Sequence, residues 1–122
     1  MTHDERAKLT QVLFKAAAEM GNKKNKSYAD KTDTLANFKR IAEKMGLTKY
    51  QIWAVYFNKH IDSINNAIKD HPELPVDASE SLEGRLIDVI VYSTILYCLL
   101  YEDLEDVLKE TYDKERHTAR AS

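Results

Sequence analysis

The sequence has little of what disulfide-rich and β-rich proteins need. Its single cysteine, Cys98, excludes an internal disulfide and a zinc site built from cysteines. Three glycines and two prolines are too few for the many turns of a β-rich fold. A net charge of −2 gives no overall field that would attract nucleic acid or an anionic membrane. Any anion-binding site must therefore come from a local group of bases.

Signals for export and for membrane insertion are also missing. The N-terminal sequence MTHDERAKLT lacks the basic and then apolar order of a signal peptide. The longest apolar run, Leu86 to Tyr101, contains Asp88 and is shorter than the roughly 20 apolar residues that a bilayer span needs. Cys98 lies in this run, which predicts a buried thiol. We expect a soluble protein of the cytoplasm that binds neither membrane nor nucleic acid.

The length of 122 residues predicts a single domain over 1–122. Apolar residues recur through most of this chain with the period of an α-helix. Apolar spacing of three and four predicts helices over residues 4–20, 35–45, 49–70 and 82–112. Capping and stop residues mark their ends: Thr2, Gly21, Asp33 or Thr34, Gly46, Thr48, and Ser79 or Ser81. The tail over 109–122 loses this periodicity and is expected to fray.

The last of these helices is apolar on nearly every side between Leu86 and Tyr101. Such a helix must be surrounded, and three other helices in so small a domain can surround it only in part. The sequence therefore predicts an all-α fold: a four-helix bundle with a long central C-terminal helix, completed by a second subunit in a dimer or a higher homo-oligomer.

Asp88 is the first candidate for a functional residue, because it is a carboxylate among apolar neighbours and needs a partner. Tyr92 follows four residues later and lies on the same face of the helix. One interpretation is a structural ion pair with a Lys or Arg of a neighbouring helix. The other is contact with a ligand or a metal ion.

Basic and polar residues supply further candidates. Lys23, Lys26 and Tyr28 fall in a segment read as an exposed loop, where cations suit phosphates and a ring can stack on a base. Asn37 and Arg40 on the second helix and Lys59 on the third can also meet a ligand. The alternative is that these residues belong to a solvated basic loop and to solvent-exposed helix faces and bind no ligand.

An acidic group could hold magnesium, since carboxylates three and four residues apart can present oxygens to a hard cation. Its members are Glu102, Asp103, Glu105 and Asp106. The alternative is the solvated end of an amphipathic helix. The four histidines show no metal-binding spacing, and no glycine-rich phosphate loop is present.

Four segments in this order resemble the nucleotide modification associated domain of the first type, a family often found in phages. The segments are SYAD, ANFKRIAE, NKHIDSINN and ESLEGRLIDVIVYSTILYCLL, and the resemblance spans about Lys23 to Glu102. It implies an all-helical protein of nucleotide metabolism or phage–host conflict, in the host cytoplasm if a phage encodes it. The matching positions are Lys26, Tyr28, Asn37, Phe38, Lys59, Asp88 and Tyr92.

The chain is also distantly similar to the MazG-like all-α pyrophosphohydrolases, helical dimers that hold magnesium with an ExxE and an ExxD motif. Here the motif is incomplete, because no ExxE occurs in the first two helices and Arg85 stands three residues before Asp88. Only Glu83 and Asp88 remain to hold magnesium. With fewer oxygen ligands than the complete motifs supply, we expect metal-assisted hydrolysis to be severely reduced.

The leading hypothesis is thus non-catalytic binding of a phosphorylated, nucleotide-derived small molecule without a cofactor, as in a phage sponge that sequesters a cyclic nucleotide immune signal. The expected ligand-binding residues are Lys23, Lys26, Tyr28, Asn37, Arg40, Lys59, Asp88 and Tyr92. One alternative is a divergent magnesium-dependent pyrophosphohydrolase using Glu83 and Asp88. Another is a helical module that docks on a protein through its last helix.

Overall fold

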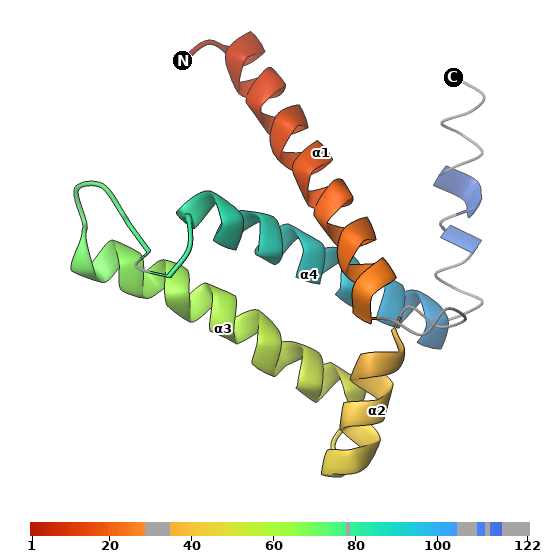
Figure 1. The fold of residues 1–122 in the computed structure, drawn as a ribbon. Helices are drawn as coiled ribbons and strands as arrows, with labels where there is room; N and C mark the ends of the chain where they lie inside the picture. Colours follow the sequence, from red (N-terminus) through yellow and green to blue (C-terminus); the bar gives the residue numbers. More distant parts are fainter. Residues whose placement is uncertain (29–34, 78, 105–109, 112, 116–122) are drawn as a thin grey trace.

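The computed structural model confirms an all-α fold (Figure 1). It describes residues 1–28, 35–77, 79–104, 110–111 and 113–115, with only the backbone described for 24–28. The helices are α1 (His3–Tyr28), α2 (Ala36–Met45), α3 (Lys49–Asp70) and α4 (Leu82–Asp103). The predicted cap residues Asp33 and Thr34 lie outside this part of the chain.

The helices pack around α4, the central element that the sequence predicted. α3 and α4 lie side by side and run in opposite directions, joined by the segment 71–81 (Figure 1). The C-terminal half of α1 crosses α4, while α2 packs against α3. The N-terminal half of α1 projects away from the other helices (Figure 1).

Local capping chemistry explains most helix ends. Thr2 Oγ1 accepts a hydrogen bond from the backbone N–H of Glu5 at 3.1 Å, and Ser81 Oγ accepts one from Gly84 at 3.0 Å. Thr48 forms a complete capping box with Gln51 at the start of α3. Gly46 ends α2 with φ of 68°, a left-handed conformation that glycine adopts without steric cost. These caps confirm the sequence prediction.

Two predicted helix ends are wrong. Gly21 does not stop α1, which continues to Tyr28, and residues 21–28 are therefore helical rather than part of a loop. A Cβ at Gly21 would lie 4.0 Å from Cγ1 of Val91, so this glycine sits where α1 packs against α4. α4 was expected to reach about residue 112 but ends at Asp103, with Leu104 as its C-cap.

The core is small, and α4 is covered only in part by the other described helices. Leu99 is fully buried and Val91 nearly so, whereas Leu86, Tyr97 and Leu100 are between 36% and 45% exposed. Cys98 is exposed, so the prediction of a buried thiol is wrong. This face of α4 is left uncovered by α1 and α3. The sequence predicted that the cover of this helix is incomplete, but not which face stays open.

By length and composition alone, α4 could cross a membrane. The sequence argument that the apolar run is too short does not hold for the whole helix, which has 22 residues. Two charged side chains of this helix, Arg85 and Asp88, are buried against neighbouring parts of the chain.

The C-terminal end of α4 is tied to α2 and α3 by charged and polar contacts. Glu102 pairs with Lys39 at 3.0 Å, and Asp103 pairs with Lys49 at 2.8 Å. Tyr50 donates its hydroxyl to Asp103 at 2.6 Å and also lies 3.1 Å from the Leu99 carbonyl oxygen. Glu102 and Asp103 thus contact bases of other helices. Glu105 and Asp106, the other predicted magnesium ligands, lie outside the described residues.

The Tyr50 contact predicts a loss of stability at alkaline pH. Burial and the neighbouring Asp103 raise the pKa of Tyr50 to about 12, from an ordinary 10.0. Folding therefore favours the protonated phenol, a contribution that is complete below pH 10.0 and disappears as the pH rises to about 12. We expect Tyr50→Phe to reduce the fall in unfolding free energy over this range, measured by urea denaturation at several pH values. Equal pH slopes in both proteins would contradict this assignment.

Candidate functional site

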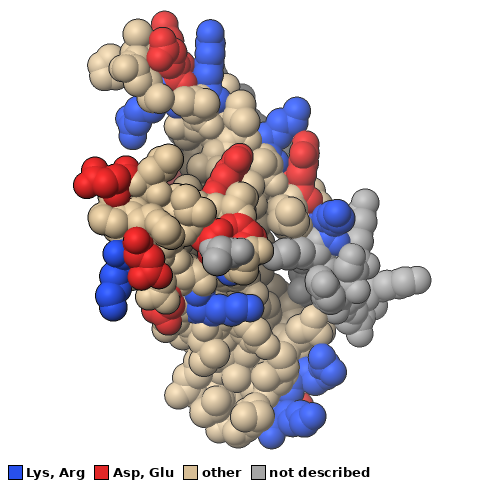
Figure 2. Space-filling model, turned by 60° about the vertical axis from the view of Figure 1, so that its left-hand side comes forward, with Lys and Arg blue, Asp and Glu red and all other residues tan. Residues whose placement is uncertain are grey.

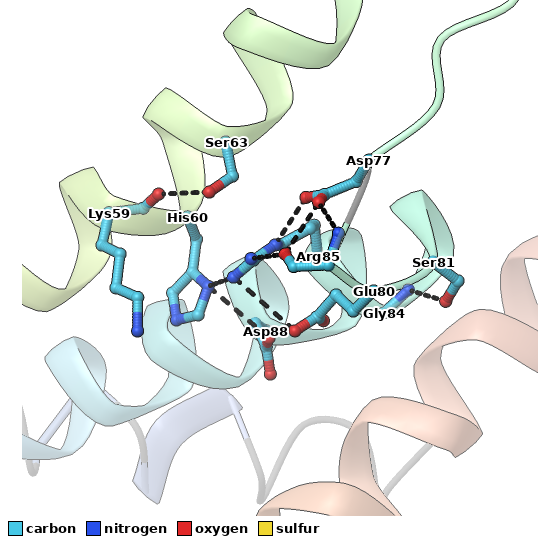
Figure 3. A network of polar contacts seen from close by, with 10 residues as sticks. Lys59, His60, Ser63, Asp77, Glu80, Ser81, Gly84, Arg85 and Asp88 are labelled. Atoms are coloured by element: carbon cyan, nitrogen blue, oxygen red, sulfur yellow. Dashed lines mark hydrogen bonds and ion pairs between the residues drawn. The ribbon is translucent and has the colours of Figure 1, made fainter.

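A network of polar side chains joins α3, α4 and the segment before α4 (Figure 3). Arg85 is at its centre and is only 8% exposed. Its Nε donates to Asp77 Oδ2 at 2.9 Å, and its Nη2 donates to Ser79 Oγ at 3.0 Å. Glu80 lies 3.6 Å from the same guanidinium. The network thereby fixes the segment that leads into α4.

Asp77 is held as a carboxylate by these neighbours. The backbone N–H of Ser79 and then the Arg85 guanidinium lower the pKa of Asp77 well below its ordinary value of 3.8. The hydrogen bond to Asp77 raises the pKa of Arg85 in turn. Both side chains therefore remain charged at neutral pH, which keeps this end of the network ionic.

His60 connects this ionic end to Asp88. Its Nδ1 lies 3.3 Å from Nη1 of Arg85 and 3.5 Å from Oδ2 of Asp88. His60 and Asp88 are both only 8% exposed, which places a histidine from α3 and a carboxylate from α4 together in the protein interior. The sequence predicted that Asp88 needs a partner on a neighbouring helix but expected Lys or Arg. That partner includes His60.

Aromatic rings gather beside His60 and Asp88. The Tyr92 ring centroid lies 5.1 Å from that of His60 and 6.4 Å from that of Tyr56, with which it stacks. Phe38 of α2 meets Tyr56 and Tyr92 edge-on at 6.2 and 6.3 Å. Burial, with Asp88 and Tyr56, raises the pKa of Tyr92. We call Phe38, Tyr56, His60, Asp88 and Tyr92 the aromatic–acid cluster.

Lys59 lies at the edge of this cluster and is exposed. Its side chain leaves α3 in the same general direction as that of His60 (Figure 3). Tyr56, one turn earlier, is 38% exposed, so part of its ring faces solvent. The cluster thus presents part of the Tyr56 ring to solvent beside the exposed Lys59, and its carboxylate, Asp88, is buried.

The remaining predicted ligand residues are less closely grouped. Asn37 is half-buried on α2, and its Oδ1 accepts a hydrogen bond from the exposed Arg40 at 3.3 Å. These two residues flank Phe38 in the sequence. Lys23 is exposed on α1. The side chains of Lys26 and Tyr28 lie outside the described part of the structure.

Within the described residues, no group of three or more His, Cys, Asp or Glu side chains is arranged to hold a metal ion. Glu83, proposed with Asp88 for magnesium, is exposed in the first turn of α4, where a carboxylate favours the positive end of the helix dipole. Asp88, by contrast, is buried beside His60. The two carboxylates therefore occupy different environments.

Sequence reasoning missed His60, Asp77 and Arg85 as site residues. His60 borders the apolar stripe of α3, and Arg85 lies one turn before Asp88, so their helical positions carried a signal. Asp77 belongs to the connecting segment, and its contact with Arg85 depends on the fold of that segment. Comparison of the chain with family models, with curated proteins and with solved structures found no match.

Proposed function

We propose that the aromatic–acid cluster binds a phosphorylated, nucleotide-type small molecule and holds it without turnover. The observation that carries this proposal is the meeting of Tyr56 and Tyr92 with His60 and Asp88, next to the exposed Lys59. These residues come from α3 and α4, and Phe38 of α2 packs against both tyrosines, so the arrangement depends on the folded chain. It offers a partner for each group of a nucleotide: aromatic rings for the flat base, polar side chains for the edges of the base, and the Lys59 cation for the phosphate.

The aromatic rings suit a base or a similar flat ring. Stacking of a base on an aromatic side chain contributes about 1–3 kcal/mol and tolerates different bases. The partly exposed ring of Tyr56 can supply this face, while the phenol of Tyr92 and the carboxylate of Asp88 can contact polar edges. This division of roles predicts that the ring recognises a class of ligands and that the polar groups select among them.

Cations around the rings suit phosphate. No ion pair formed by the described residues involves Lys59, so its ammonium group is available as a point charge. Arg40 is a second exposed cation, two residues after Phe38. Arg85, in contrast, is engaged with Asp77 and serves the framework of the site.

Binding without hydrolysis is favoured over the pyrophosphohydrolase alternative. Magnesium-assisted hydrolysis needs several oxygen ligands around the metal, and the described side chains form no such group. A protein that retains its ligand can act as a sponge, for which affinity and abundance matter and turnover does not. The proposed role is therefore sequestration of a nucleotide signal in the cytoplasm.

Ligand recovery tests this proposal directly. The purified protein is incubated with linear and cyclic nucleotides and magnesium, washed, and denatured by heat, and the released compounds are identified by mass. We expect an intact nucleotide that is released only on denaturation. Conversion to a monophosphate or an opened ring would support the enzyme, and retention of no nucleotide would overturn the proposal.

Matched variants assign the binding to the cluster. Lys59→Ala is expected to weaken binding at least about tenfold, because a hydrogen bond from a charged donor contributes about 1.5–3 kcal/mol. Lys69→Ala is the control, an exposed lysine ten residues further along α3. Isothermal titration calorimetry with the recovered nucleotide measures both. Equal losses in the two variants would indicate a general charge effect and would contradict a discrete site.

A further inference from the structure

A single ring nitrogen of His60 faces both a donor and an acceptor (Figure 3). Its Nδ1 lies 3.3 Å from Nη1 of Arg85 and 3.5 Å from Oδ2 of Asp88. A guanidinium only donates and an ionised carboxylate only accepts, so this nitrogen cannot bond to both in one protonation state. We propose that protonation of Nδ1 moves His60 from Arg85 to Asp88 and releases Nη1 of Arg85 to Glu80. This rearrangement needs no bound ligand.

The neutral ring matches the contact with Arg85. An unprotonated Nδ1 accepts a hydrogen bond from Nη1, and the ring proton then resides on Nε2. His60 is thereby bonded to the guanidinium that also holds Asp77 and Ser79. In this state α3 is coupled, through Arg85, to the segment that precedes α4.

Protonation reverses the sign of this contact. The Nδ1–H group of the imidazolium repels the Arg85 guanidinium and donates to Asp88, whose oxygen already lies 3.5 Å away. Nη1 of Arg85 has a second partner at hand, because Oε2 of Glu80 lies 3.6 Å from it. In the acid state α3 stays bonded to α4 through Asp88, but it is uncoupled from the side chain that holds the preceding segment.

Burial makes the choice of partner consequential. Other charged side chains are spread over the surface, as Figure 2 shows for one face, and water screens them there. His60, Arg85 and Asp88 are each only 8% exposed, so water does not readily replace a lost contact. A buried donor without an acceptor is costly, and two donors facing each other at Nδ1 are more so. The exchange of partners avoids both costs.

His60 is the group of this network whose ordinary titration range lies near neutral pH. Imidazole ordinarily titrates near about pH 6.5 and carboxyl groups near about pH 4. The backbone N–H of Ser79 and the Arg85 guanidinium hold the pKa of Asp77 well below its ordinary value, and burial raises the pKa of Tyr92. Among the described side chains, the charged or titratable groups around His60 are Tyr56 and Lys59 of α3, Arg85, Asp88 and Tyr92 of α4, and Asp77 and Glu80 of the segment before α4.

Nuclear magnetic resonance of the ¹⁵N-labelled full chain tests the state of the ring. Long-range ¹H–¹⁵N correlations report which imidazole nitrogen carries the proton, and His60→Gln identifies the His60 signals among those of the four histidines. Above the titration midpoint we expect the proton on Nε2, and below it on both nitrogens. The Nε–H signal of Arg85 should shift with the same midpoint. A neutral ring protonated on Nδ1, or a ring that stays neutral until the protein unfolds, would overturn the proposal.

Variants that remove one charge test the two partners of Nδ1. Asp88→Asn should lower the His60 midpoint by about one pH unit, a tenfold change in the protonation equilibrium, because the imidazolium loses its charged acceptor. Arg85→Met should raise the midpoint, because the ring loses a repelling cation. Glu83→Gln is the control, an exposed carboxylate in the first turn of α4, and should leave the midpoint unchanged. An unchanged midpoint in Asp88→Asn, or a lower one in Arg85→Met, would contradict the exchange.

Glu80→Gln tests the last step, the transfer of Nη1 to Glu80. Without this carboxylate, the shift of the Arg85 Nε–H signal across the His60 titration should be smaller than in wild type. Glu83→Gln again serves as the control and should keep the full shift. Glu80 is exposed, so this comparison holds even where a buried variant fails to fold, which circular dichroism shows. An Arg85 shift of equal size in Glu80→Gln and in the control would overturn the transfer.

Discussion

Leu99→Ala is expected to lower the free energy of unfolding by about 2–5 kcal/mol, the range for buried leucines truncated to alanine. Leu99 has 0% exposure and is the largest fully buried side chain in the described core. The small size of this core leaves few other apolar contacts to compensate for a cavity. Urea denaturation followed by circular dichroism measures the change.

Leu100→Ala is the matched control for this effect. Leu100 follows Leu99 on α4 but is 36% exposed, so its truncation removes less buried surface. We expect a loss of no more than about 1 kcal/mol. The backbone carbonyl of Leu99 that faces the Tyr50 hydroxyl is present in both variants, so this contact does not distinguish them. Equal losses would show that Leu99 is not enclosed as the structure describes.

Arg85→Met is expected to have the second largest effect, a loss on the order of 2 kcal/mol, because it removes a buried guanidinium that donates to several polar groups at once. Methionine fills a similar volume but donates no hydrogen bond. Asp77, Ser79 and His60 would each lose a contact with the guanidinium. The free energy of unfolding at neutral pH, measured by urea denaturation, tests this expectation.

The stability that the Arg85 network contributes is expected to fall at acidic pH. Because folding lowers the pKa of Asp77, its contribution to stability is present above the ordinary value of 3.8 and is lost as the pH falls below it. The difference between wild type and Arg85→Met should therefore shrink in acid. Arg40→Met is the control, since Arg40 is exposed and bonds to Asn37 within its own helix. A larger loss from Arg40→Met than from Arg85→Met would contradict the central place of Arg85.

The sequence predicted those features of the fold that depend on nearby residues. Thr48 with Gln51, Ser81, and Gly46 act through neighbours a few positions away, and all were found at helix ends as expected. Gly21 was wrongly predicted to end α1, because its role is tertiary: it lies in α1 where that helix packs against Val91 of α4. The burial of Cys98 was wrongly predicted for a related reason, since apolar composition does not show which face of α4 the other helices cover.

The candidate site was predicted in part. Asp88, Tyr92 and Lys59 were chosen because a carboxylate, a phenol and a cation interrupt or border apolar helix faces, and the structure brings the first two into one cluster. The pairing of His60 with Asp88 joins residues 28 positions apart, which periodicity within one helix cannot reveal. Side-chain contacts of Lys26 and Tyr28 remain predictions.

Trp53 gives the protein an intrinsic fluorescent reporter. It is the sole tryptophan of the chain, it stacks on Phe57 at 4.7 Å, and its Nε1 donates to the backbone carbonyl of Tyr92 at 2.7 Å. Indole emission depends on the polarity and hydrogen bonding around the ring. Displacement of α4 relative to α3 at Tyr92 would therefore change emission without any added label. Ligand binding, acid unfolding of the Arg85 network and core truncation could all be followed by the same optical signal.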